Sequence, residues 1–302
     1  MKRKFLILTM AAALLFTFYG CGQSSSTGGA GNGGTITVGS KNFTENIIIA
    51  HMMADLVEED TDLKVIRKVN LGGSNVAWKA LESNDIQMYP DYTGTIVANY
   101  YQEKTGTSQE TLEKALQLTA QDKLMLFEPF GFNNTYTLAV TQETAQKYNL
   151  NTFSDLAKVS AELLLGCEFE FKDRPDGYPG LQGVYNMNFK DVKGMDHGIM
   201  YRSLNSGDVD VVDAYATDGQ INVYNLKILQ DDKEFFPPYD ALPVVRQDTA
   251  DKYPQIKEAL NKLAGSIDEK SMQELNAKVD SDGLKAETVA HDFLVSRGLI
   301  KK

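Results

Sequence analysis

The segment TITVGSKNFTENIIIAHMMADLVEE, residues 35–59, contains a predicted strand that leads directly into a predicted helix. Its first five residues are rich in β-branched side chains, which favours a strand. Ile48, Met52 and Leu56 then recur every four residues, the spacing of one face of a helix. A strand followed by a helix is the repeating unit of α/β proteins, so this segment indicates an α/β fold.

The same alternation continues along the chain. Strand-like runs at residues 64–69 and 85–89 flank a helical segment that follows the glycine-rich turn at residues 71–75. Two further strand-like runs, residues 124–130 and 135–140, follow each other with no helix between them. We interpret this interruption as the point where the chain crosses from one α/β lobe to another.

A second α/β series extends over residues 162–232, and the double proline at residues 237–238 ends it. The remainder of the chain has the pattern of helices. We therefore expect two α/β lobes joined by two crossovers, with a ligand cleft between them. The expected boundaries are residues 35–134 plus 237–302 for one lobe and residues 135–236 for the other.

Two of the predicted helices begin with a capping box, in which a hydroxyl residue and a Glu three positions later cap each other. Thr107 and Glu110 form one such pair, and Ser266 and Glu269 form the other. We therefore expect helices to start directly after Thr107 and Ser266.

The first 20 residues have the pattern of a secretory signal peptide. Three positive charges within residues 1–4 precede an apolar run, residues 5–19, that is short for a membrane span. The run ends just before Cys21, which predicts cleavage there and attachment of lipid to Cys21. Residues 21–34 are mostly Gly, Ser, Thr and Asn, which predicts a flexible tether. We expect a protein anchored to the extracytoplasmic face of the cell membrane; the alternative is an ordinary signal peptide with an incidental cysteine.

The composition excludes one class of partner and one kind of cross-link. The 302-residue chain has a formal net charge of −11, so nucleic acid is not an expected partner. With Cys21 acylated, Cys167 is the only other cysteine, and the mature chain cannot form an internal disulfide. The apolar neighbours of Cys167 predict that it fills the core.

No sequence pattern points to catalysis, a metal or a cofactor. His51, His197 and His291 each stand alone, without a second ligand at the spacing of a metal site, so we expect structural or surface roles for them. Nucleophile-elbow, zinc-protease and phosphate-loop motifs are absent from the sequence. The turn at residues 71–75 could bind an anion through its amides, but such turns usually only start a helix.

Four tyrosines occupy places where α/β proteins bind ligands. Tyr92 and Tyr215 directly follow strand-like runs, and the carboxyl ends of strands in open sheets form ligand sites. Tyr136 and Tyr239 lie at the two predicted crossovers. A quaternary ammonium group has no N–H to donate, so aromatic faces are its natural receptor. The placement of these rings predicts a cation site, with packing in the core as the alternative.

Six motifs occur in an order that is characteristic of one protein family. They are GSKNFTE (39–45), YPDYTGT (89–95), NNTYTLAV (133–140), RPDGYPGL (174–181), DAYATDGQ (213–220) and FFPPYDALPVV (235–245). Through them, residues 35–302 resemble the glycine betaine-, carnitine- and choline-binding lipoproteins of osmoprotectant ABC transporters. The resemblance implies a type II periplasmic-binding fold, with two α/β lobes that close on a ligand.

The resemblance also implies a binding site. The family's aromatic cage falls on Tyr92, Tyr136, Tyr215 and Tyr239. Its carboxylate-binding basic residues fall on Lys41 and Arg174. An arginine can hold a carboxylate with two parallel bonds, and a lysine adds a point charge. The alternatives are a solvated loop position for Lys41 and an ion pair with Asp173 or Asp176 for Arg174.

Two further residues, Asp91 and Asn134, adjoin the cage and could orient its rings or add charge. The resemblance implies a monomeric receptor, not an enzyme, that captures a small quaternary-ammonium compound and delivers it to the permease of an ABC importer. One alternative is a receptor of the same fold for an amino acid or another small cation, because N–H groups need acceptors such as Asp91. The other is an exported enzyme, which would convert its ligand.

Overall fold

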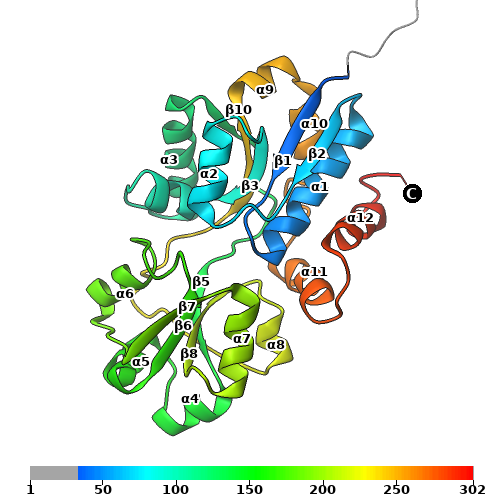
Figure 1. The fold of residues 1–302 in the computed structure, drawn as a ribbon. Helices are drawn as coiled ribbons and strands as arrows, with labels where there is room; N and C mark the ends of the chain where they lie inside the picture. Colours follow the sequence, from blue (N-terminus) through cyan, green and yellow to red (C-terminus); the bar gives the residue numbers. More distant parts are fainter. Residues whose placement is uncertain (1–32, 302) are drawn as a thin grey trace, which may run out of the picture. The chain divides into compact units, whose positions relative to one another are not determined.

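Two five-stranded sheets organise the computed structural model, which describes residues 33–301 (Figure 1). The predicted signal peptide, Cys21 and most of the predicted tether lie outside the described residues. We call the first sheet with its helices lobe 1 and the second sheet with its helices lobe 2. The two α/β sheets confirm the predicted fold class.

The sheet of lobe 1 has the strand order β2-β1-β3-β10-β4. Strand β1 pairs in parallel with β2 and β3, whereas β10 is antiparallel to β3 and β4. The strands are β1 (Thr35–Gly39), β2 (Lys64–Lys68), β3 (Met88–Tyr92), β4 (Leu124–Leu126) and β10 (Ala241–Arg246).

The sheet of lobe 2 repeats this arrangement in the order β7-β6-β8-β5-β9. Strand β6 is parallel to β7 and β8, and β5 is antiparallel to β8. The chain passes from the first sheet to the second between β4 and β5 and returns between β9 and β10. The strands are β5 (Tyr136–Val140), β6 (Leu164–Glu168), β7 (Asp191–Met195), β8 (Val211–Tyr215) and β9 (Lys227–Leu229).

Helices pack beside both sheets (Figure 1). Those of lobe 1 are α1 (Thr44–Asp60), α2 (Ser74–Glu82), the π-helix η1 (Thr95–Tyr100), α3 (Ser108–Gln121), α9 (Gln247–Lys252), α10 (Gln255–Asn261), α11 (Glu269–Asp280) and α12 (Ala286–Ser296). Those of lobe 2 are α4 (Gln142–Tyr148), α5 (Phe153–Val159), the short 3₁₀ helix η2 (Ser160–Glu162), α6 (Tyr178–Tyr185), α7 (His197–Ser206) and α8 (Gln220–Val223).

Helix α1 is the central helix of lobe 1. The predicted face of Ile48, Met52 and Leu56 is fully buried, and Ile49 and Met53 on the neighbouring face are buried as well. The wider burial arises because α10, α11 and α12 also contact α1. Each such side chain stabilises the fold by roughly 1.5 to 3 kcal/mol relative to exposure. The start of α1 is thereby held firmly, and the candidate site is built on it.

One predicted helix cap is confirmed and the other is wrong. Thr107 and Glu110 form the predicted capping box at the start of α3. Helix α11 is capped by Asp268, which accepts a hydrogen bond from the Ser271 amide at 2.7 Å. Ser266 cannot serve there because its hydroxyl donates to the Leu263 carbonyl at 2.8 Å. The predicted core position of Cys167 is confirmed, since it is fully buried in β6.

Candidate ligand-binding site

A small cavity, with about 10 Å³ of free space, lies where the two lobes meet. It is lined by residues of both lobes: Lys41, Phe43, Tyr92, Thr95, Asn134, Tyr136, Glu170, Arg174, Tyr215 and Tyr239. All the ligand-contacting residues predicted from the sequence are in this lining except Asp91. The fold therefore brings residues from several distant motifs together around one cavity.

The four tyrosines reach the cavity through equivalent places in the two sheets. Tyr92 is the last residue of β3 and pairs with the first residue of β10, two positions after Tyr239. Tyr215 is the last residue of β8 and pairs with Tyr136, the first residue of β5. Each lobe thus contributes one ring from the carboxyl end of a central strand and one from the antiparallel neighbour, either its first residue, Tyr136, or two residues before it, Tyr239.

The rings pack against each other around the cavity. The centroid of Tyr136 lies 4.8 Å from that of Tyr215 and 5.4 Å from that of Tyr239, the latter pair edge to face at 81°. Phe43 completes the ring set, with its centroid 5.4 Å from Tyr215 and 6.2 Å from Tyr92. Sequence reasoning missed Phe43, although it lies inside the GSKNFTE motif and directly precedes α1.

Three of the cage hydroxyls are held by buried carboxylates. Tyr92 donates to Glu45 at 2.6 Å, Tyr239 donates to Asp176 at 2.8 Å, and Tyr215 donates to Glu168. Burial, and then the neighbouring carboxylate, raises the pKa of each of these tyrosines well above its ordinary value. The phenols therefore stay protonated, and each hydroxyl is held by its carboxylate. Donation to a carboxylate also makes the ring face more electron-rich, which suits a cation.

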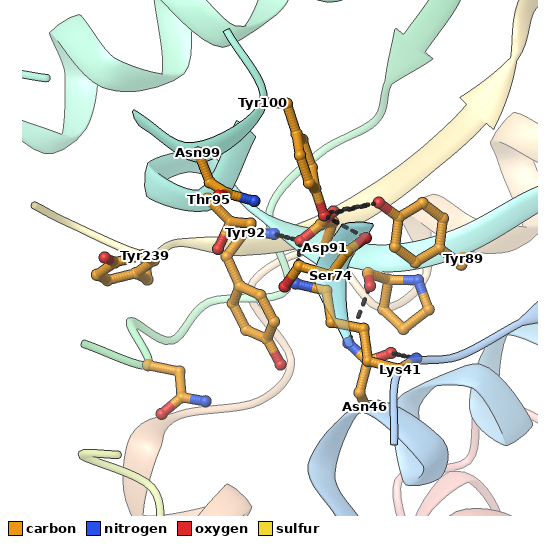
Figure 2. A network of polar contacts seen from close by, with 12 residues as sticks. Lys41, Asn46, Ser74, Tyr89, Asp91, Tyr92, Thr95, Asn99, Tyr100 and Tyr239 are labelled. Carbon is orange, nitrogen blue, oxygen red and sulfur yellow. Dashed lines mark hydrogen bonds and ion pairs between the residues drawn. The ribbon is translucent and has the colours of Figure 1, made fainter. Parts of the chain in front are cut away.

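Lys41 is buried and paired, which excludes the solvated loop position. Its side chain is 3% exposed, and its Nζ lies 2.6 Å from Asp91 (Figure 2). Asp91 does not line the cavity but lies behind Lys41, where it also accepts hydrogen bonds from Tyr89 and Tyr100. Asp91 therefore positions Lys41 and does not contact the cavity itself. The Lys41 ammonium lies 5.0 Å from the centroid of the Tyr92 ring.

Arg174 has the ion pair with Asp176 that was the alternative from the sequence. Its Nε and Nη2 donate to the two Asp176 oxygens at 2.8 and 2.5 Å, and Nη1 donates to Glu170 at 3.1 Å. Burial alone would raise the pKa of Asp176, but Arg174 lowers it below its ordinary value. The same guanidinium also donates to Ser74 and Thr95 of lobe 1. Arg174 lines the cavity and at the same time joins the two lobes.

Glu45 is a site residue that sequence reasoning missed. It is 2% exposed, in the first turn of α1. Burial raises the pKa of Glu45 to about 7, against hydrogen bonds from Thr217 and Tyr92 that favour the charged form. The signal for this residue was present as the last letter of the GSKNFTE motif. A Glu in the first turn of a helix is ordinary, however, so the sequence alone does not single it out.

His197 also has a more specific place than was predicted. Its ring is stacked on Tyr215 at 5.3 Å and 18°, with its two nitrogens 3.1 Å from Glu168 and from Asp218. Burial lowers the pKa of His197, but the two carboxylates outweigh it and raise that pKa well above its ordinary value. His197 borders a second cavity of about 260 Å³ that shares Glu170 with the first. Among residues 33–301, no group of His, Cys, Asp and Glu side chains is arranged to hold a metal.

Comparisons with known proteins bear on the whole chain. The family model described as the substrate binding domain of ABC-type glycine betaine transport system matches residues 34–296. The carnitine transport binding protein OpuCC of Listeria monocytogenes is 36% identical over 298 residues, covering 97% of this chain and 97% of that protein. The ergothioneine transport permease/ergothioneine binding protein EgtU of Helicobacter pylori is 36% identical over 269 residues. That match covers 87% of this chain and 48% of the relative.

A solved structure agrees with these relatives. The crystal structure titled glycine betaine/carnitine/choline ABC transporter is 35% identical, with a TM-score of 0.70 over 87% of this chain and 99% of that one. No helix between residues 33 and 301 combines the length and apolar composition that a membrane span requires. The family is one of transport receptors and not of enzymes. The chain therefore belongs to the family of substrate-binding domains of ABC-type glycine betaine transport systems.

Proposed function

We propose that this protein captures a small quaternary-ammonium osmoprotectant in the tyrosine-lined cavity and delivers it to the permease of an ABC importer. The observation that carries the proposal is the convergence of Tyr92, Tyr136, Tyr215 and Tyr239 on one small cavity. A trimethylammonium group spreads its charge over methyl groups and donates no hydrogen bond, so ring faces suit it better than a carboxylate does. Carnitine and ergothioneine, named for two of the relatives, both carry this group.

The cavity has a second side that suits the other end of a betaine. Lys41 and Arg174 both line it, and neither has a lone pair to offer a cation. A ligand carboxylate could share these donors with Asp91 and Asp176.

A receptor for an amino acid or another primary amine is the weaker proposal. Ammonium N–H groups need acceptors, and the sequence offered Asp91 for that role. Asp91 lies behind the cavity wall and already accepts from Lys41, Tyr89 and Tyr100. Glu170, the carboxylate in the lining, already accepts from Ser74 and Arg174.

We further propose that ligand uptake is a hinge motion between residues 35–134 plus 237–302 and residues 135–236. Several polar contacts in the structure join these two parts. Glu170 accepts from the Ser74 amide at 2.6 Å and from its hydroxyl at 2.9 Å, and Thr217 donates to Glu45 at 2.5 Å. Opening would break these bonds, and ligand contacts with both lobes would favour their return.

The proposed location is the extracytoplasmic face of the cell membrane, with a monomeric domain held by lipid on Cys21 and the tether of residues 21–34. Lipid labelling and fractionation test it. Cys21→Ala should release the protein from membranes while its affinity for ligand stays unchanged, because the tether separates the anchor from the fold. Membrane retention of a Cys21→Ala protein whose signal peptide has been cleaved would contradict the anchor.

Calorimetric titration of the mature domain with glycine betaine, carnitine, choline, ergothioneine and a set of amino acids tests the function itself. We expect saturable binding of at least one quaternary-ammonium compound, with the ligand recovered chemically unchanged. Binding of primary amines alone would favour the alternative receptor. Binding of none of the quaternary-ammonium compounds would refute the proposal, and conversion of the bound ligand would indicate an enzyme.

A further inference from the structure

The carboxylates behind three cage tyrosines differ in one respect. Asp176, behind Tyr239, is paired with Arg174 at 2.5 Å. Glu168, behind Tyr215, lies 3.1 Å from His197. Glu45, behind Tyr92, forms no ion pair with any Lys, Arg or His of residues 33–301. It is the one carboxylate of this set that is buried without a positive partner.

All the groups that hydrogen-bond to Glu45 are neutral donors. Tyr92 donates to it at 2.6 Å, Asn134 at 2.8 Å, Thr217 at 2.5 Å and Asn276 at 3.4 Å. When Glu45 is ionised, such bonds satisfy its oxygens but leave one net negative charge. An isolated buried charge is unfavourable, and its field is poorly screened by a protein interior. A cation brought into the neighbouring space would therefore be strongly attracted.

The candidate cavity adjoins Glu45 through two of its lining residues. Tyr92 and Asn134 line it, and both bind Glu45 directly, so Glu45 lies one residue behind the wall. Its charge acts on the cavity through the Tyr92 ring, which it polarises, and through space. The other two carboxylates act more weakly because Arg174 and His197 offset their charges.

We propose that Glu45 makes this site select a positively charged ligand over a neutral molecule of the same shape, with the ligand's cation as the counter-charge of the Glu45 carboxylate. The inference rests on the proposed function of the cavity and goes beyond it, because it assigns charge selection to a residue that does not line the wall. Glu45 is a positioning residue in this role and not a direct ligand contact.

A consequence is that ligand binding is linked to loss of a proton. In the ligand-free protein, burial raises the pKa of Glu45 to about 7, so a large fraction is neutral at physiological pH. A bound cation favours the ionised form and drives the proton off. Binding therefore weakens as the pH falls through about 7, and it releases protons near neutral pH.

Other charged groups nearby could contribute to a pH profile. Lys41 and its partner Asp91 lie beside Tyr92. The carboxylate of Asp218, which follows β8 and is held by His197, adds to the rise in the pKa of Glu45. Asp280 on α11 is bonded to Thr44, the neighbour of Glu45. Substitution of Glu45 itself is required to separate its contribution from theirs.

The experiment compares choline with its neutral isostere 3,3-dimethylbutan-1-ol. Calorimetric titrations over pH 5.5 to 8, in buffers of different ionisation enthalpy, give affinities and proton release for the wild type, Glu45→Gln and Glu45→Asp. Glu59→Gln, at the far end of α1, is the matched control. We expect the wild type to prefer choline and to lose about tenfold in choline affinity over this range.

Glu45→Gln should reduce the preference for choline by about tenfold or more and give a flat pH profile without proton release. Glu45→Asp should keep the preference, and Glu59→Gln should match the wild type. A folded Glu45→Gln protein that keeps the preference and the profile would overturn the inference. So would choline binding by the wild type without proton release, even if Glu45→Gln fails to fold. Failure of the wild type to bind any quaternary-ammonium compound would instead overturn the proposed function, and this inference with it.

Discussion

The two lobes have the same scaffold but different charges. In each sheet a central strand ends in a cage tyrosine, Tyr92 or Tyr215, beside an antiparallel strand that begins at or shortly after the other cage tyrosine. Behind these rings the lobes diverge. Tyr92 of lobe 1 donates to Glu45, whose hydrogen-bond partners are all neutral. Tyr215 of lobe 2 donates to Glu168, which lies beside His197.

This difference shows which properties follow from topology and which do not. Strand order places rings symmetrically, because the carboxyl ends of both central strands open toward the same cavity. Charge is set by individual side chains, so symmetry of the scaffold does not impose symmetry of the electrostatic field. Substitutions can test the shared ring faces and the different carboxylate charges separately.

The largest expected effect is on choline affinity, and it tests the ring faces that both lobes contribute. Tyr92→Ala and Tyr215→Ala should each weaken binding of choline by roughly 1 to 2 kcal/mol, because each removes one ring face from a desolvated cation. Combined, they should cost roughly 2 to 4 kcal/mol if the two lobes contribute independently. Calorimetric titration of both single variants and the double variant measures this. A loss confined to one lobe would show that the symmetric rings are not functionally equivalent.

The second prediction tests the difference in charge through stability. In ligand-free protein, the pKa of Glu45 is raised to about 7, so its contribution to stability is complete below its unfolded pKa near 4.5 and is lost as the pH rises through 7. Relative to wild type, Glu45→Gln should therefore gain on the order of 3 kcal/mol in free energy of unfolding between pH 4.5 and pH 8. Denaturant titrations at several pH values give this difference.

Asp176→Asn in lobe 2 provides the comparison of opposite sign. The pKa of Asp176 is lowered by Arg174, so its stabilising contribution is present above the unfolded pKa and is lost as the pH falls. Asp176→Asn should therefore lose stability relative to wild type as the pH rises from acid to neutral. If both variants showed the same trend, the two carboxylates would not differ in the way the contacts indicate.

The third prediction compares the two basic residues of the cavity. Arg174→Ala should weaken glycine betaine about tenfold more than choline, because a charged hydrogen bond to a carboxylate is worth roughly 1.5 to 3 kcal/mol and one to a hydroxyl about 1. Lys41→Ala should act in the same direction but less, since a flexible ammonium is more easily replaced by water. Titration of both variants with both ligands gives the ratio.

The ratio between ligands is informative because Arg174→Ala also leaves Asp176 and Glu170 without their cation. That loss is common to both ligands and cancels in the ratio. Arg67→Ala, which removes an ion-paired arginine from β2, is a control that should leave both affinities unchanged. Equal losses of glycine betaine and choline in Arg174→Ala would mean that Arg174 only supports the junction of the lobes.

The smallest expected effect concerns the hydroxyls of the cage. Tyr239→Phe removes a donor from buried Asp176 and should weaken choline binding by roughly 1 kcal/mol. Tyr136→Phe removes only a hydroxyl that lies 3.3 Å from the Tyr215 hydroxyl, so its effect should be smaller. Both keep the ring face. If either Phe variant were as damaging as Ala at the same position, hydrogen bonding rather than the ring would dominate.

Much of the fold and part of the candidate site could be predicted from the sequence. The alternation of strands and helices predicted both sheets because local hydrophobic period and strand length are properties of short segments. Tyr92 and Tyr215 could be assigned to the site because a strand end is visible in sequence. The ion pair of Arg174 with Asp176 was one of the stated alternatives because the two residues are two positions apart.

The contacts that the tertiary structure decided join distant residues. Glu45 accepts hydrogen bonds from Asn134, 89 positions away in the sequence, and from Thr217, 172 positions away. No local sequence pattern predicts such partners. Without them Glu45 is an ordinary first-turn Glu, and His197 an isolated histidine. The sequence by itself determined the α/β elements and the placement of tyrosines at strand ends, because both depend on local spacing. Only the packing of the lobes decided which carboxylates are buried and which lack a cation, because burial and charge pairing depend on what the fold brings alongside.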